Sequence, residues 1–232
     1  MRRTSGLATG ANATFSSAVN SVKPGIRLST SLAVAAIGLL TVLSGRTGAF
    51  SLSGPSWPQA QTPYYINSAN LDLAGPAAEA AVRAGADAWL LQAGAFRFAY
   101  AGPSSQTTNT NDQINLVLFR DAANGSAIAT TYWWSSNNRI IDADIVFWDA
   151  GFTFFAGTTG CSGGFYIEDI AAHEFGHALG MGHSDIAGAT MYPSVSYCNT
   201  ANRTLDADDI AGVRALYPPL TPPTPTGVRI IR

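Results

Sequence analysis

Apolar and polar residues alternate along several short stretches of the chain, and such alternation is typical of β-strands with one buried face. The clearest case is residues 113–120, where the apolar positions are Ile114, Leu116 and Leu118. Strands of the same kind are expected at residues 61–67, 96–100, 127–134 and 139–148. The pattern therefore predicts five strands.

Other stretches predict helices. Ala78, Val82, Ala86 and Trp89 recur three or four residues apart, so an amphipathic helix with Trp89 in the core is expected from Pro76 to about residue 92. A second helix is expected over residues 167–179. Asp206 suits the N-cap of a last helix, and Asp209 can reach back as the acid of a capping box.

The second predicted helix carries His173 and Glu174 in a run that continues to His177 and His183. Residues four apart lie on one face of a helix, so His173 and His177 can bind one ion together, while Glu174 sits beside it. Gly180 can end the helix in a left-handed conformation, and the chain can then return with His183 as a third ligand. Three protein ligands and an open fourth position are typical of a catalytic zinc.

An ordinary buried helix with core histidines is the alternative. All three histidines of the chain fall within these eleven residues, which favours the metal. The spacing matches the long zinc-peptidase motif with a third histidine and a downstream Met-turn.

The residues after this motif narrow the resemblance. Ser184 follows the third histidine, and Met191 lies in the stretch Ala-Thr-Met-Tyr-Pro at residues 189–193. With residues 205–217, which look like a closing helix, these features resemble the matrixin family of the metzincin clan. The resemblance is strong over residues 165–217 and weaker, but in register, over 57–164.

The resemblance implies an α+β fold of the metzincin type. A twisted, mostly parallel five-stranded sheet would carry the first helix and the active-site helix on one side. The zinc cleft would lie above a small lower part that holds the Met-turn and the C-terminal helix. Asp208 and Asp209 would support the floor of the site, and Asp208 or Asp209 could tie down the mature N-terminus.

It also implies a secreted zinc endopeptidase. His173, His177 and His183 would bind the zinc, Glu174 would be the general base, and Met191 would form an apolar floor. An extended peptide would pair with the edge strand at residues 127–131. Val195 stands where many matrixins have a tyrosine in the wall of the pocket for the residue after the cut, and an apolar residue is still expected there.

The N-terminal part predicts export. Residues 32–43 form an apolar run that follows basic residues and precedes small residues at 47–49. We interpret residues 1–49 as a signal peptide, with an uncleaved membrane anchor as the alternative. Residues 50–217 would then be the catalytic domain and 218–232 a proline-rich tail. No cysteine precedes Cys161, so activity is expected without further processing.

Two pairs of residues outside the motif leave alternatives open. Cys161 and Cys198 flank the predicted site, and export favours a disulfide between them over two free buried thiols. Asp142 and Asp144 fall on the polar alternation of their strand. They predict a solvated strand face, with a contribution to calcium binding as the alternative.

Charge and composition limit the partners. Residues 50–232 hold eight arginines against fifteen acids, so a basic surface for nucleic acid is not expected. The predicted partners are peptide or protein substrates of a monomer. Because no histidine lies outside the motif, we expect one zinc, with calcium as a possible second ion. A non-catalytic adhesion module that retains the fold, or a member of another metzincin family, is the alternative.

Overall fold

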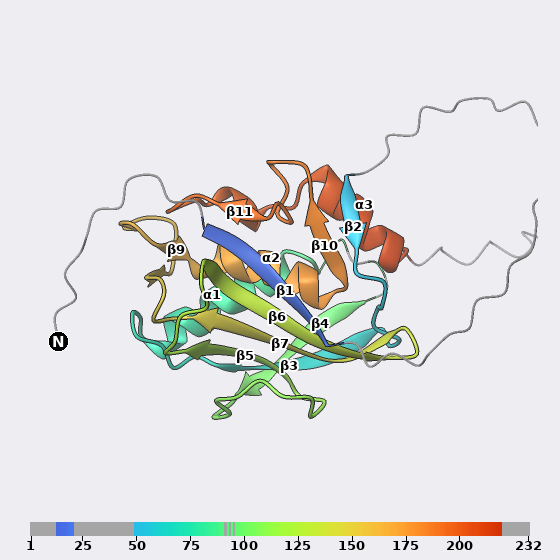
Figure 1. The fold of residues 1–232 in the computed structure, drawn as a ribbon, viewed down its shortest axis with the longest axis horizontal. Helices are drawn as coiled ribbons and strands as arrows, with labels where there is room; N and C mark the ends of the chain where they lie inside the picture. The colour runs from blue at the N-terminus through green and yellow to red at the C-terminus, as the bar shows by residue number, and fades with distance from the viewer. Residues whose placement is uncertain (1–12, 21–48, 91, 93, 95, 220–232) are drawn as a thin grey trace, which may run out of the picture.

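The computed structural model describes residues 13–20, and residues 49–219 apart from 91, 93 and 95. Among these residues the main sheet has seven strands in the order β11-β1-β6-β7-β5-β3-β4 (Figure 1). Their bounds are Ala13–Asn20 for β1, Gln61–Asn67 for β3, Arg97–Pro103 for β4, Asn115–Arg120 for β5, Ala127–Ser136 for β6, Arg139–Trp148 for β7 and Ser194–Val195 for β11.

The five predicted strands form the centre of this sheet. Strands β4, β3, β5 and β7 are mutually parallel, and β6 runs antiparallel to β7. Strand β1 was not predicted: it pairs in parallel with β6, and β11 pairs with its other edge. The α+β fold and the mostly parallel five-stranded core are therefore confirmed, with two further strands added beyond β6.

Two small sheets lie beside the main one. Strand β2 (Phe50–Leu52) pairs antiparallel with β10 (Met181–Ser184), and β8 (Phe154–Phe155) pairs in parallel with β9 (Phe165–Tyr166). The first brings the segment after the predicted signal peptide against the strand that carries His183. The second leads directly into the helix that carries His173 and His177.

The helices are α1 (Gly75–Asp87), α2 (Ile167–Ala178) and α3 (Ala207–Leu216), with a short 3-10 helix η1 at Ala201–Arg203. Helix α2 packs between α1 and the strands β6 and β7. Helix α1 ends earlier than predicted, at Asp87, and the indole of Trp89 beyond its end donates to the carbonyl of Ala172. Helix α3 begins with the predicted capping box of Asp206 and Asp209.

The prediction of a solvated face for Asp142 and Asp144 is wrong. Both side chains are fully buried in β7, which lies in the middle of the sheet. The loop before β5 and the start of that strand cover them: Asp142 accepts from the backbone of Asp112 and Gln113, and Asp144 from that of Thr110 and Leu116. These carboxylates therefore hold the 110–116 segment onto the sheet. Burial, assisted by the charge of Asp142, raises the pKa of Asp144 to about 7.

The ends of the chain are described in part. Strand β1 falls inside the predicted signal peptide, whereas its apolar run at residues 32–43 and most of the proline-rich tail lie outside the described residues. Among the helices that are described, none combines the length and the apolar character needed to cross a bilayer. The predicted disulfide between Cys161 and Cys198 is present.

Candidate metal centre and active site

The three histidines converge on one point. His173 and His177 lie one turn apart on α2, and His183 lies on β10 after the chain has reversed at Gly180. Gly180 has a φ of 100°, and a Cβ there would collide with the carbonyl of Pro55, so this turn needs glycine. One ring nitrogen from each histidine lies within 4.8 Å of the others. The turn thus closes a three-nitrogen site that the helix alone could not form.

The second nitrogen of each helical imidazole fixes its tautomer. Nδ1 of His173 donates to the carbonyl of Thr190 at 2.6 Å, and Nδ1 of His177 donates to that of Met181 at 2.9 Å. Nε2 of each ring is thereby left as the lone-pair nitrogen, and the two Nε2 atoms lie 3.0 Å apart. Nε2 of His183 is buried and has no hydrogen-bond partner among the described residues. This donor set fits a zinc ion.

The electrostatic surroundings keep these imidazoles neutral. Burial, with a smaller effect of His183, lowers the pKa of His177 to about 3. Burial also holds the pKa of His173 well below its ordinary value and lowers that of His183. Since a metal binds the neutral imidazole, the ligand set is ready for metal at neutral pH.

Glu174, the residue after His173, is fully buried. Its Oε2 accepts a hydrogen bond of 2.5 Å from the hydroxyl of Thr131 on β6, while Oε1 has no partner among the described residues. Burial raises the pKa of Glu174 to about 8, and the bond from Thr131 acts in the opposite direction. A carboxylate with one oriented oxygen and a pKa near neutrality is suited to take up a proton.

Met191 packs against helix α2 at Gly176. Its side chain is fully buried, and a Cβ at Gly176 would collide with its sulfur, so the glycine of the motif permits this close approach. Asp209 holds the turn from below, because its two oxygens accept from the backbone N–H groups of Thr190 and Met191 at 2.7 and 3.0 Å. The Met-turn and the last helix are thus joined under the three histidines.

Asp208 joins three segments on the other side of the floor. Its Oδ2 accepts from the hydroxyl of Ser184 at 2.6 Å, and its Oδ1 accepts from the backbone N–H of Ala49 at 2.7 Å. The residue after the third histidine and Ala49, the last residue of the predicted signal peptide, are therefore both tied to α3. Cleavage after Ala49 would remove the N–H that bonds Oδ1, so the implied contact between the aspartate pair and the mature N-terminus stays a prediction.

Strand β1 lies between β6 and β11 in the main sheet (Figure 1). Thr14 of β1 is in register with Ala127, and Ser17 with Thr131, so β1 covers the same edge that was predicted to pair with substrate. Ala13 is in register with Val195 of β11.

Several contributors carry no signal in the sequence. Thr131 reaches Glu174 from a strand 43 residues away. Trp57 donates from Nε1 to the carbonyl of Ala178, and the hydroxyl of Tyr217 donates to that of Leu179, so both brace the end of α2. Each is a single aromatic or polar residue, and only the folded chain shows what it contacts.

Comparison with known proteins identifies a family for most of the chain. The sequence profile described as matrixin matches residues 56–218. Human (Homo sapiens) neutrophil collagenase is 46% identical over 59 residues, which cover 25% of this chain and 13% of that protein. Matrix metalloproteinase-20 from Homo sapiens is 50% identical over 56 residues, or 24% of this chain and 12% of that protein. Bovine (Bos taurus) interstitial collagenase is 49% identical over 55 residues, which cover 24% of this chain and 11% of that protein. The alignments thus cover only about an eighth of each relative, but the family profile spans most of this chain, and the chain belongs to the matrixin family.

Proposed function

We propose that this protein is a zinc-dependent endopeptidase in which His173, His177 and His183 bind the metal and Glu174 is the general base. The observation that carries this proposal is the convergence of three neutral ring nitrogens within 4.8 Å, beside a buried carboxylate. Membership of the matrixin family supports the same reaction class.

Each of these residues has a separate role in peptide hydrolysis. When bound, zinc supplies the Lewis acidity that polarises a carbonyl and lowers the pKa of water towards about 7. Glu174 takes the proton from the attacking water and passes it to the leaving amine. Thr131 keeps Oε2 of Glu174 in place, so that Oε1 is the oxygen available for the proton. The carbonyls of Thr190 and Met181 hold the two helical rings.

The substrate is an extended peptide or protein segment that adds to the edge of β6 through backbone hydrogen bonds. A cavity of about 610 Å³ lies beside the Met-turn and is lined by Tyr192, Val195, Tyr197 and Asn202 among others. Val195 supports the prediction that an apolar side chain follows the scissile bond. Cleavage-site profiling with a peptide library would refute this if a charged residue were preferred there.

We also propose that the protein is exported from the cell. Residues 1–49 would be removed as a signal peptide, which would also remove β1 from the edge of β6. The catalytic domain of residues 50–217 would act outside the cell as a monomer that holds one zinc, with any further ion being calcium. Elemental analysis that finds two tightly held zincs would refute the metal count.

A matched pair of variants tests the mechanism. Glu174→Ala should keep the zinc and the fold, because Glu174 is not a ligand, and should lose several orders of magnitude of peptidase activity. His177→Ala should lose the metal itself. If Glu174→Ala retains near-normal activity, the proposed base is wrong. If the wild-type protein binds zinc but cleaves no peptide in a broad library, the non-catalytic binding module becomes the better interpretation.

A further inference from the structure

The carbonyl oxygen of Thr190 connects a zinc-ligand candidate to the segment after the Met-turn. It accepts from Nδ1 of His173 at 2.6 Å and from Nδ2 of Asn202 at 3.4 Å. In return, the hydroxyl of Thr190 donates to the carbonyl of Asn202 at 3.2 Å. The place of the oxygen that orients His173 therefore depends on where Asn202 lies.

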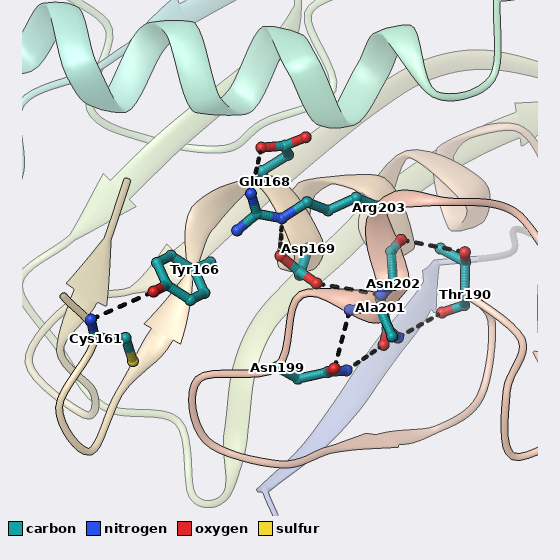
Figure 2. Close-up of polar contacts among 9 residues, drawn as sticks. All are labelled: Cys161, Tyr166, Glu168, Asp169, Thr190, Asn199, Ala201, Asn202 and Arg203. Atoms are coloured by element: carbon teal, nitrogen blue, oxygen red, sulfur yellow. Dashed lines mark hydrogen bonds and ion pairs between the residues drawn. The ribbon is translucent and has the colours of Figure 1, made fainter. Parts of the chain in front are cut away.

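Asn202 is in turn fixed to the first turns of α2 (Figure 2). Its backbone N–H donates to Oδ1 of Asp169 at 3.2 Å, while Nε of Arg203 donates to Oδ2 of the same carboxylate at 2.6 Å. Arg203 also pairs with Glu168 at 3.0 Å, and its guanidinium lies 4.8 Å from the ring centroid of Tyr166. Asp169 thus holds η1 through two adjacent residues at once.

These contacts close a circuit, because Asp169 and His173 are four residues apart on the same face of α2. The path runs from Asp169 to Asn202, from Asn202 to Thr190, and from Thr190 back to His173. All four residues are buried. In a buried circuit of this kind, the loss of one bond frees the groups that follow it.

Stability alone is a weak reason for such an arrangement. Taking a carboxylate and a guanidinium out of water costs about as much as their attraction returns, and well-packed apolar residues often serve stability equally well. Unlike apolar side chains, hydrogen-bonded ions fix the orientation of the groups that they bond. Here the group that is oriented is the carbonyl of Thr190, which accepts from the ring of His173.

We propose that Asp169 and Asn202 are positioning residues for His173, acting through the carbonyl of Thr190. They keep this carbonyl where it holds the Nδ1–H tautomer and the ring plane, so that Nε2 stays directed at the other two ligand nitrogens. Arg203 anchors Asp169 through Oδ2, the oxygen that does not bond Asn202. The inference rests on the proposed zinc site.

The test compares three variants of the full chain. Asn202→Ala removes the amide that reaches Thr190 and keeps the backbone bonds of η1. Asp169→Ala removes the anchor. Glu168→Ala is the matched control, because it removes an ion pair with the same Arg203 and leaves the path intact. For each protein, the zinc dissociation constant is measured by competition with a chromophoric chelator. The visible spectrum of the cobalt-loaded form and the melting temperature of the metal-free form are also measured.

Asn202→Ala and Asp169→Ala should bind zinc roughly 10- to 100-fold more weakly than wild type, the usual effect of losing an outer-shell partner. Both should also alter the cobalt spectrum. Glu168→Ala should stay within about twofold of wild type, on the same scale of outer-shell effects. The inference is overturned if Asn202→Ala and Asp169→Ala retain wild-type zinc affinity and spectrum, even with a lower melting temperature, because the circuit would then be structural only. Should Asp169→Ala fail to fold, Asn202→Ala decides. A wild-type protein that binds no zinc would refute the proposed function itself.

Discussion

The hydroxyl of Thr131 donates to Oε2 of Glu174 at 2.5 Å and also lies 3.0 Å from the backbone carbonyl of the same residue. A strand of the sheet thereby holds the proposed base on the helix. Because the hydroxyl stabilises the charged carboxylate, it lowers the pKa of Glu174 against the effect of burial.

Replacement of Thr131 by valine keeps the shape of the side chain and removes this bond. Hydrogen bonds to charged groups contribute about 1.5–3 kcal/mol, so kcat should fall roughly tenfold or more. The pKa of Glu174 should rise further. Since the base must be deprotonated, the acidic limb of the kcat/KM profile should move to higher pH. Thr130→Val is the control, because that hydroxyl bonds Trp148 instead. An unshifted profile for Thr131→Val would contradict the role.

The second prediction concerns β1, whose Ser17 is in register with Thr131. A substrate that adds to the edge of β6 must compete with this strand. The chain that retains its N-terminus should therefore cleave a peptide more slowly than the form that starts at residue 50, with a higher KM. A synthetic peptide of residues 13–20 should inhibit the shorter form. The same assay tests whether the form that starts at residue 50 is active without further processing.

Equal activity of the two forms, and no effect of the peptide, would mean that β1 does not compete for the edge. A scrambled peptide of the same composition is the control, because it separates pairing in register from general binding of an extended chain.

The third prediction concerns the disulfide between Cys161 and Cys198, which closes a loop with a sequence separation of 37 around the helix and the Met-turn. In the loop-entropy account its loss should lower the free energy of unfolding by about 3–4 kcal/mol. Denaturant unfolding of the double serine variant measures this. Reduction of the wild type should reproduce the loss. A change below about 1 kcal/mol would show that the unfolded chain gains little freedom when the bond is removed.

What the sequence could predict depends on how local each signal is. The histidine spacing, the Met-turn and the capping box of Asp206 and Asp209 lie within short segments, and the structure has all of them. Alternation also located the five central strands. Alternation could not show that Asp142 and Asp144 are buried. The face of β7 that carries them is covered by the loop before β5, and the sequence of β7 gives no sign of that loop.

Contacts between distant segments were beyond such reasoning. Asp169 meets Asn202 and Arg203 across more than thirty residues, and a lone aspartate in an apolar helix carries no spacing signature. Strand β1 was missed for a related reason, since its sequence mixes small and polar residues without clear alternation and lies within a segment interpreted as a signal peptide.

The last prediction concerns the stability of the metal-free protein at low pH. Burial and the neighbouring His183 lower the pKa of His177 to about 3, whereas an unfolded histidine titrates near about 6.5. Below that pH the unfolded chain binds a proton that the folded chain cannot bind. Stability from this group is thus fully present above pH of about 6.5 and is lost as the pH falls, by up to about 1.4 kcal/mol per pH unit.

The variant His177→Asn isolates this effect, because asparagine does not titrate and its amide can still donate towards the carbonyl of Met181. The difference in free energy of unfolding between the wild type and the variant, both stripped of metal, should be constant above pH of about 6.5. Below it, the wild type should lose stability relative to the variant down to about pH 3. Urea unfolding at a series of pH values measures the difference. Parallel stability curves for the two proteins across this range would mean that His177 takes up a proton as readily in the folded chain as in the unfolded one, which its burial and its hydrogen bond to Met181 argue against.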